Sequence, residues 1–325
     1  MCWGRSMQAE GGDVPDQREG HRAMRLGTVT VTFHPDRDVL QQQMRALPGD
    51  AVKVVVDNSC DEEVAQGLFA LRDAIPGLQL LFNSSNLGLA AALDQGVRML
   101  AQAVPPCTDV LLLDQDSEPL EQAVAELVQA FDRLQRQGMR PGAVGPRLLD
   151  HDTGLAHGFH RMTRWRWTRV YPTAPQEPVS VTNLNGSGTL MPLPIYLQLG
   201  GLDHGLFIDH VDTEWSFRLL SAGYTLWGVP AAAFRHRMGE RGLRWWLFGW
   251  RVWPARSAPR HRYLFRNTLW LMRRPYVPRT WKFWAGIKLL VTFTVHAVFD
   301  PQRGAQMRCM GQGLREGLGP PGGRN

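Results

Sequence analysis

The sequence predicts an α/β fold in which a mostly parallel sheet carries helices on both faces. From residue 26 to 149, short β-rich runs alternate with amphipathic segments of helical length, an alternation typical of parallel sheets covered by helices. Polar residues follow the ends of the apolar runs, where ligands bind in such sheets. The composition, 44% hydrophobic and 20% charged over 325 residues, fits a folded protein and excludes disordered, collagen-like and repeat-array chains.

Four strands and four helices account for the alternating region. The expected strands are rich in β-branched and aliphatic residues and cover residues 27–33, 51–57, 78–82 and 109–114. The expected helices cover residues 36–47, 61–75, 89–103 and 119–137. Asp36 and Asp61 are the expected N-caps. Gly49 and Gly77 stand just past helix ends, where left-handed backbone favours glycine.

The rest of the chain differs in character. Residues 150–230 are turn-rich, with a helix expected over residues 213–222 and a strand over residues 225–229. Between Arg235 and Lys282, thirteen arginines and lysines accompany a single acid, although the whole chain carries only +6. Seven of the 12 tryptophans lie in the same part of the chain, namely Trp245, Trp246, Trp250, Trp253, Trp270, Trp281 and Trp284.

This basic, tryptophan-rich stretch has three interpretations. Arginines and aromatic rings can bind nucleic acids through phosphate and stacking contacts. An anionic membrane surface attracts arginine and accepts tryptophan at its headgroups. The same residues can also decorate a packing helix. A nucleic-acid-binding protein would leave five acids without a role, because unpaired acids repel phosphates, and these are Asp114, Asp116, Asp209, Asp212 and Glu214.

Residues 1–25 are polar and charged and contain no apolar core like that of a signal peptide, so we expect a disordered tail. The longest apolar run, residues 283–299, is 17 residues long and contains Lys288 and His296, whereas a span needs about 20 apolar residues. We expect a helix lying in a membrane interface or packed on a core. Four scattered cysteines without a C-x-x-C pair predict neither a disulfide framework nor a zinc site, and favour a reducing, cytosolic setting.

The motif from Asp114 to Ser117 is the most informative one for chemistry. It follows an apolar strand, so Asp114 and Asp116 lie on the same side of the chain at the open edge of the sheet. Two such carboxylates can hold a divalent cation together with phosphates, and they can also be solvated residues of a turn.

The 57–59 segment could bind a base or ribose or cap a helix. The 86–92 segment could admit a diphosphate or allow close packing.

Two further segments could contribute to a site. Asp209, Asp212 and Glu214 lie before or at the start of an expected helix, and one of them could act as a general base or as a helix cap. His236 follows the expected strand, and a neutral imidazole is a common metal ligand as well as a common structural residue.

In this order, the segments resemble the family 2 glycosyltransferases of the Rossmann-like GT-A fold, most closely the bacterial rhamnosyltransferase branch, from about residue 26 to 310. Residues 31–36 are similar to the nucleotide loop, residues 57–59 to the base-binding motif, residues 86–88 to the N-x-G segment, and residues 114–116 to the metal-binding D-x-D motif. Asp94 stands where this branch often has Asn. The resemblance implies donor contacts by Thr32, His34, Asp57, Asn86, Gly88, Asp114 and Gln115, and a Mg²⁺ or Mn²⁺ ion held by Asp114, Asp116 and His236.

Residues 200–218 resemble the acceptor-side motif of the family, and Asp212 falls on its catalytic base. Many members have Glu where this chain has Val211, so help from a neighbouring carboxylate would come from Asp209 or Glu214. Residues 263–267 resemble a segment that faces acceptor or membrane. The implied acceptor-side or supporting residues are Gly186, Ser187, Gly188, Asp209, Glu214 and Arg218.

The resemblance implies an inverting transferase that moves a sugar, namely L-rhamnose from dTDP-rhamnose, to a hydroxyl of a lipid-linked or cell-surface glycan. A UDP-hexose or UDP-galactofuranose donor is the alternative, and a nucleic-acid-binding protein the remote one. We expect polysaccharide or cell-wall biosynthesis at the inner face of the cytoplasmic membrane. The expected parts are a tail (1–25), a catalytic domain (26–235) with nucleotide (26–149) and acceptor (150–235) halves, a basic membrane-associating helical segment (236–310) and a flexible tail (311–325).

Overall fold

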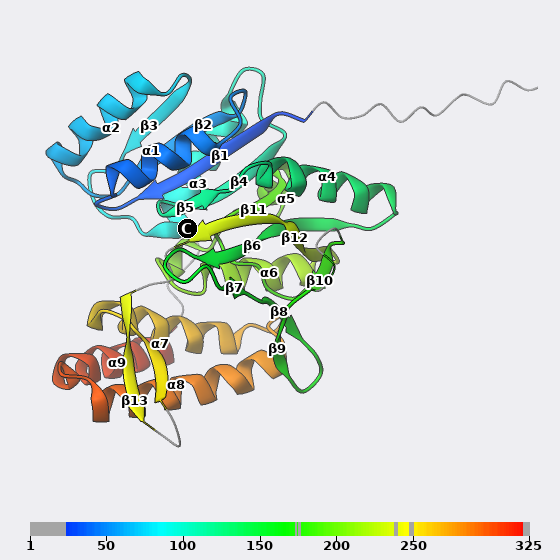
Figure 1. Ribbon diagram of the computed structural model, residues 1–325. Helices are drawn as coiled ribbons and strands as arrows, with labels where there is room; N and C mark the ends of the chain where they lie inside the picture. The colour runs from blue at the N-terminus through cyan, green and yellow to red at the C-terminus, as the bar shows by residue number, and fades with distance from the viewer. Residues whose placement is uncertain (1–23, 173, 175–176, 237–239, 247–249, 321–325) are drawn as a thin grey trace, which may run out of the picture.

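The computed structural model describes residues 24–172, 174, 177–236, 240–246 and 250–320. Three tiers follow one another down Figure 1: the first α/β half, the second half built on the same sheet, and a C-terminal group of helices. The expected disordered N-terminal tail falls almost entirely on residues 1–23, and part of the expected C-terminal tail falls on residues 321–325, both of which lie outside the described residues.

The first half alternates as predicted. Four parallel strands lie in the order β3-β2-β1-β4: β1 (Leu26–Thr32), β2 (Val52–Asp57), β3 (Leu78–Phe82) and β4 (Asp109–Asp114). One sheet face packs on α3 and the other on α1, α2 and α4, which span Leu89–Gln102, Arg37–Ala46, Glu62–Ala74 and Ala123–Arg136. Thr32 lies beside Asp57, and Val31 lies beside Asp114. The polar strand ends therefore meet at one edge, as expected.

The helix caps are mostly those expected. Asp36 and Asp61 accept hydrogen bonds from backbone N–H groups in the first turns of α1 and α2, and Gly77 has a φ of +74°. Gly49 is not among the residues with positive φ, so that expectation was wrong. Helix α1 ends in extended backbone at Leu47, which precedes a proline, and a residue before proline is driven out of the helical region.

The second half extends the same sheet, in the order β4-β11-β6-β12-β10. Strand β11 is antiparallel to both of its neighbours, whereas β12 is parallel to β6. The bounds of these elements are β5 (Ser117–Pro119), β6 (Pro141–Asp150), β7 (Ala156–His157), β10 (Val179–Val181), β11 (Thr189–Pro192), α5 (Leu193–Gln198), α6 (Val211–Ser221) and β12 (Thr225–His236). The sheet is thus mixed but parallel in its first half, which confirms the predicted fold class.

Strand β12 is longer than the sequence predicts. It continues past residue 229 through a register shift and ends at His236. Its last residues pair with β5, so that His236 lies beside Ser117. The same pairing explains why α4 begins at Ala123 rather than at Pro119: residues 117–119 are used as a strand.

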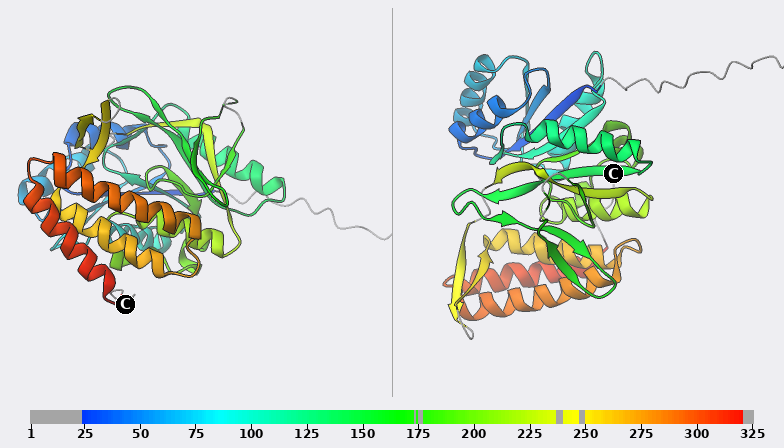
Figure 2. Two further views of the ribbon diagram at one scale, coloured as in Figure 1. Left: turned by 90° about the horizontal axis from the view of Figure 1, so that it is seen from below. Right: turned by 45° about the vertical axis from the view of Figure 1, so that its right-hand side comes forward.

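The C-terminal tier is only partly the helical segment expected over residues 236–310. It begins with a hairpin of β13 (Glu240–Trp246) and β14 (Trp250–Ala255), which is followed by α7 (Ala258–Arg273), α8 (Arg279–Phe299) and α9 (Arg303–Leu318). The three helices lie side by side in both views of Figure 2. Helix α9 continues to Leu318, so residues 311–318 are helical rather than a flexible tail.

The clustered tryptophans serve more than one role. Trp270 and Trp281 are 6% and 1% exposed and belong to the core that joins the C-terminal tier to the sheet, whereas Trp284 is 38% exposed. The side chains of Trp245, Trp246 and Trp250 lie outside the described part of the structure. Helix α8 is the one described helix that is long and apolar enough to cross a membrane, by length and composition alone.

Candidate active site

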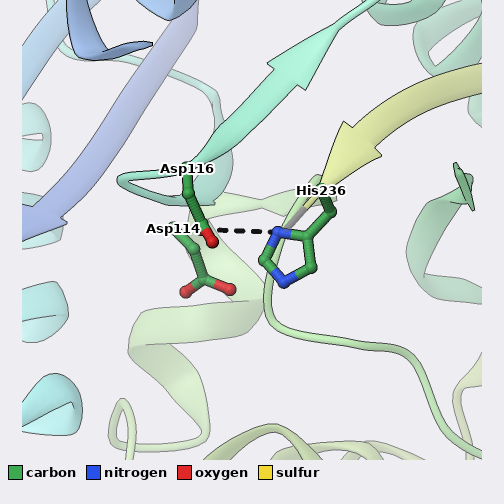
Figure 3. A group of neighbouring side chains, drawn as sticks. All are labelled: Asp114, Asp116 and His236. Carbon is green, nitrogen blue, oxygen red and sulfur yellow. Dashed lines mark ion pairs between the residues drawn. The ribbon is translucent and has the colours of Figure 1, made fainter. Parts of the chain in front are cut away.

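Two aspartates and a histidine converge at the carboxyl edge of the sheet. Asp114 ends β4, Asp116 lies in the following turn, and His236 ends β12 (Figure 3). One potential ligand atom from each lies within 4.8 Å of the others, and the Nδ1 atom of His236 is 3.4 Å from an Asp116 carboxylate oxygen. Carboxylate oxygens and an imidazole form a donor set that divalent cations such as Mg²⁺ and Mn²⁺ accept. The fold therefore brings together the three residues expected to hold a metal.

The protonation behaviour of Asp114 reflects this crowding. Burial, with smaller contributions from Asp116 and Asp212, raises the pKa of Asp114 to about 6, and His236 and Arg260 oppose the increase. Because neighbouring carboxylates repel one another when both are ionised, a cation between Asp114 and Asp116 would relieve the repulsion. The same interaction places Asp212 within electrostatic reach of the cluster.

The turn that carries the aspartates is fixed by two glutamines. Gln43 of α1 donates hydrogen bonds to the backbone oxygens of Asp114 (2.7 Å) and Ser117 (2.5 Å). The side-chain oxygen of Gln115 accepts from the backbone N–H of Phe33 (2.7 Å), and its amide donates back to the Phe33 carbonyl. Gln115, expected to contact the donor, therefore also connects the D-x-D turn to the nucleotide loop.

The expected nucleotide site is organised around Asp57, which is 2% exposed. One oxygen of Asp57 accepts hydrogen bonds from the hydroxyls of Thr32 and Ser59, both at 2.7 Å, and the other accepts from the Ser59 N–H. The backbone N–H of His34 donates to the same Ser59 hydroxyl (2.7 Å). The fold thus brings Thr32, His34 and Asp57, three of the residues expected to contact the donor, into one connected group at the ends of β1 and β2.

The 86–88 segment joins this site to the acceptor side. The Asn86 side chain accepts a hydrogen bond from the Gly88 N–H (2.9 Å). Gly88 has a φ of +82°, and a Cβ there would lie 2.5 Å from the ring of Phe207. The N–H of Leu89 donates to the Phe207 carbonyl (2.6 Å). Glycine is therefore required here for the contact with Phe207.

Asp212 lies in the first turn of α6, where the helix dipole stabilises a carboxylate. Its side chain accepts from the Thr213 N–H (2.7 Å) and interacts with the backbone of Gly186. Burial raises the pKa of Asp212, Asp209 adds to the increase, and the Thr213 and Gly186 hydrogen bonds oppose it. A partly buried carboxylate with a raised pKa is a suitable general base.

The 186–188 segment connects Asp212 with the group formed by Asp114, Asp116 and His236. The Ser187 hydroxyl makes a close hydrogen bond to that of Ser117, which in turn contacts the Nδ1 atom of His236 at 3.1 Å. Gly188 has a φ of +77°, and its N–H donates to the Leu112 carbonyl of β4 (2.8 Å). Gly186, Ser187 and Gly188 therefore connect Asp212 to the edge that carries the aspartates.

The other acidic residues of the acceptor motif are held by arginines. Asp209 pairs with Arg256 and Arg260, which keep its pKa below the ordinary value despite burial. Glu214 is completely buried and pairs with Arg218 of its own helix and with Arg274. Because these ion pairs occupy its carboxylate, Glu214 holds α6 to the C-terminal tier instead of meeting a substrate.

Sequence reasoning did not find the arginines that pair with Asp209. Arg256 and Arg260 are 47 and 51 residues away from it along the chain, and the one available signal was the density of basic residues after Arg235. Asp94, which departs from the usual Asn, accepts hydrogen bonds from Tyr196 (2.9 Å) and Arg98 (3.0 Å). Its polar contacts are therefore internal to the protein.

Known proteins share this geometry and parts of this sequence. Residues 37–176 match the family model described as glycosyl transferase family 2. A Shigella flexneri protein named dTDP-rhamnosyl transferase RfbF is 26% identical over 255 residues, which are 77% of this chain and 80% of that protein. A Mycobacterium tuberculosis protein named N-acetylglucosaminyl-diphospho-decaprenol L-rhamnosyltransferase is 26% identical over 238 residues, 65% of this chain and 75% of that protein.

Two solved structures show the same fold at low sequence identity. The mannosyltransferase PcManGT from Pyrobaculum calidifontis, in complex with GDP-Man and Mn²⁺, superimposes with a TM-score of 0.53 at 14% identity, covering 90% of this chain and 87% of that one. GalNAc-T7 with UDP, GalNAc and Mn²⁺ gives a TM-score of 0.52 at 16% identity, covering 85% of this chain but only 58% of the other. These likenesses agree with the predicted fold class.

Proposed function

We propose that this chain, a family 2 glycosyltransferase, transfers L-rhamnose from dTDP-rhamnose to a hydroxyl of a lipid-linked or cell-surface glycan. The family match supports the reaction class, and the names of the two relatives support the sugar. The observation that carries the proposal is the position of Asp212, within electrostatic reach of a cluster of two aspartates and one histidine.

The chemistry needs a base for the acceptor and a stabilised leaving group for the donor. Asp212 accepts the proton of the acceptor hydroxyl while that oxygen forms a bond to the anomeric carbon. The bond from this carbon to the diphosphate breaks on the opposite face, so the anomeric configuration inverts. A Mg²⁺ or Mn²⁺ ion held by Asp114, Asp116 and His236 would neutralise negative charge on the diphosphate.

The donor nucleotide would lie at the carboxyl ends of β1 and β2. Asp57, Thr32 and His34 form the connected group there, and Asn86, Gly88 and Gln115 border it. The same side chains could accept a uracil nucleotide, so a UDP-hexose or UDP-galactofuranose is the alternative donor. The choice of donor depends on how much more favourably the site binds the correct sugar nucleotide than its competitors.

A donor panel tests this proposal. The full chain is mixed with dTDP-, UDP- and GDP-sugars, with Mg²⁺, with Mn²⁺ or with EDTA, and thermal stabilisation and donor hydrolysis are measured. We expect dTDP-rhamnose with a divalent cation to give the largest shift, since a ligand that binds only the folded state raises its stability. A preference for a UDP-sugar would identify that sugar nucleotide as the donor in place of dTDP-rhamnose. No response to any donor would contradict the proposal that the protein is an enzyme.

We also propose that the enzyme binds the inner face of the cytoplasmic membrane, and α8 supports this. The buried side of the helix combines apolar residues, among them Trp281 and Leu289, with Thr292 and His296. Its opposite side exposes large apolar residues, among them Phe283 (63%) and Leu290 (67%). A helix at a water-facing surface normally presents polar residues to the solvent, and an exposed apolar face bordered by cations fits a membrane interface.

The β8–β9 hairpin continues this face. Strands β8 (Phe159–Met162) and β9 (Trp167–Val170) are joined by a tip in which Trp165 is 74% exposed between two exposed arginines. The Trp284 indole N–H donates to the Trp165 carbonyl (3.2 Å), so the tip is attached to α8. Tryptophan and arginine together are the residues that headgroup regions of anionic membranes favour.

Flotation with anionic liposomes tests the membrane proposal, with oligonucleotide binding measured in parallel over a salt series. We expect the protein to float with the liposomes and the Trp165→Ala, Phe283→Ser double variant to lose most of this binding. Phe69→Ser is the control, because Phe69 is 42% exposed on α2 at the other end of the molecule. Tighter binding to oligonucleotides than to liposomes would instead favour the nucleic-acid interpretation of the basic segment.

A further inference from the structure

The segment that leads into α6, residues 205–210, has a strained backbone. Three of its residues have positive φ although none of them is glycine: Phe207 (+62°), Asp209 (+61°) and His210 (+64°). The ψ of Phe207 is −66°, and the N–H of residue 208 donates to the carbonyl of residue 206 (2.7 Å), which is the rare, strained kind of γ-turn. Such backbone persists only where surrounding contacts hold it.

One buried side chain holds the middle of this segment. Asn267 of α7 is completely buried. Its amide nitrogen donates to the backbone carbonyls of Leu206 (2.7 Å), Ile208 (2.7 Å) and Asp209 (3.0 Å). Its side-chain oxygen accepts from the Nε–H of Arg266 (2.9 Å), which fixes the amide with its nitrogen toward the segment. The amide therefore grips the backbone on both sides of the γ-turn.

Neighbouring residues of α7 hold the two ends of the segment. Arg266 donates to the Gly205 carbonyl (2.7 Å). At the other end, the Nε2 atom of His210 lies 3.0 Å from the Thr268 hydroxyl. That hydroxyl donates to a carbonyl of its own helix (2.7 Å), so it accepts from His210. Helix α7 thus supports the segment along its whole length, with Asn267 at the centre.

The segment connects Asp212 to the donor side of the site. The carbonyl of His210 accepts the N–H of Glu214 (2.9 Å), in the first turn of α6, which carries Asp212. Nearer its start, the carbonyl of Phe207 accepts the N–H of Leu89 (2.6 Å). A displacement of the segment would therefore change the distance between Asp212 and a bound donor. A misplacement of about 1 Å can reduce the rate of an enzyme by about 10²-fold.

We propose that Asn267 is a positioning residue for sugar transfer, which fixes the 205–210 segment and, through it, the carboxylate of Asp212. Its side chain is buried and bonds to backbone atoms, so it acts through the segment and not on a substrate. The inference rests on the proposed function, because it takes Asp212 as the base. Asn267 lies outside residues 37–176, which match the family model. The C-terminal tier thus takes part in shaping the site.

Steady-state hydrolysis of dTDP-rhamnose by the full chain tests the proposal, with Mg²⁺ present and water as the acceptor. Asn267→Ala should lower kcat by about 10²-fold and leave the KM for the donor unchanged, because the donor residues on β1 and β2 keep their places. Asn267→Leu retains most of the side-chain volume but no N–H group, so it should lose as much activity. Thr268→Val removes only the partner of His210 and should give a smaller loss.

Met310→Ala is the control for a loss of stability alone. Met310 is completely buried on α9 and packs with Leu264 and Phe265 of α7, so its truncation weakens the same tier through a cavity. Urea unfolding defines conditions in which every variant is folded, and kcat is compared there. Met310→Ala should keep the wild-type kcat. Equal kcat values for Asn267→Ala and Met310→Ala would overturn the proposal, and so would a raised donor KM with unchanged kcat.

Hydrogen exchange gives a second measurement that does not depend on turnover. The N–H groups of Leu206, Phe207 and Ile208 donate to backbone carbonyls, and local opening makes such groups exchange faster. They should exchange faster in Asn267→Ala than in the wild type or in Met310→Ala, and unchanged exchange would refute the role of Asn267. Failure of the proposed function would appear separately, as wild-type protein that hydrolyses no sugar nucleotide.

Discussion

Replacement of Gly88 by alanine would disturb the junction between the nucleotide and acceptor halves in two ways. Gly88 has φ +82° and ψ 170°, a backbone region that residues with a Cβ avoid. A Cβ at this position would also lie 2.5 Å from the Phe207 ring and 2.7 Å from the Phe207 carbonyl oxygen. That carbonyl accepts the hydrogen bond from Leu89, so the side chain cannot be accommodated without moving the acceptor-side loop.

The two penalties can be estimated separately. Forcing alanine into this backbone region costs about 1–3 kcal/mol, and inserting a methyl group into packed surroundings costs about 1–3 kcal/mol. We therefore expect Gly88→Ala to lower the free energy of unfolding by about 2–6 kcal/mol, a large part of the roughly 5–15 kcal/mol typical of folded domains.

Urea unfolding of three alanine variants separates these contributions. Gly77 has φ +74°, and a Cβ at this position would meet no atom within 4 Å, so Gly77→Ala should show the backbone cost alone. Gly49 has neither positive φ nor close neighbours, so Gly49→Ala should be neutral or slightly stabilising. The m-value should stay constant in all three. If Gly88→Ala loses no more stability than Gly77→Ala, the steric part of the reasoning is refuted.

Three further predictions concern catalysis and pH. Asp212→Asn should reduce transfer by at least about 10²-fold, the usual contribution of a general base, with nucleotide binding preserved, and retained turnover would contradict its role. Asp116→Ala should abolish the thermal stabilisation that a donor gives with Mg²⁺ or Mn²⁺, and unchanged metal dependence would contradict its role. Burial lowers the pKa of His261 to about 4, below the roughly 6.5 of an unfolded chain, so protonation of the unfolded state should reduce stability as pH falls from about 6.5 to about 4. His261→Gln should weaken this pH dependence in urea unfolding, and an identical dependence would refute the assignment.

The nucleotide half could be predicted from sequence because its signals are local. Strand and helix periods alternate cleanly before residue 137, and Asp36 and Asp61 cap helices by contacts within their own first turns. Strand β12 is longer than predicted because its extension to His236 depends on pairing with β5, more than 110 residues earlier. Local periodicity carries no information about such a partner.

In the candidate site, too, the residues with local signals could be predicted and those that depend on distant segments could not. The D-x-D motif and Asp212 are recognisable because each lies in a short segment with its own pattern. Strand β4 brings the D-x-D motif to the edge of the sheet, and the first turn of α6 carries Asp212. The arginines that hold Asp209 follow the β13–β14 hairpin in the chain, and about 50 residues separate them from Asp209. Charge density alone indicates that such residues exist, but only the tertiary structure shows which of them reach the site.

The sequence of α8 predicts which residues share a polar face, but it does not show whether that face points into the protein or outward. The spacing of Lys288, Thr292 and His296 predicts one polar face, and the structure turns the Thr292 and His296 part of it inward. Thr292 bonds to the backbone of its own helix (2.7 Å), and the Nδ1 atom of His296 bonds to Asp300 (2.7 Å). The Nε2 atom of His296 is buried without a partner among the described residues, which carries a cost. The outward side leaves Phe283 and Leu290 exposed, and each Å² of such apolar surface removed from water would stabilise the protein by about 25 cal/mol. The observed direction is favourable when a membrane covers the apolar side.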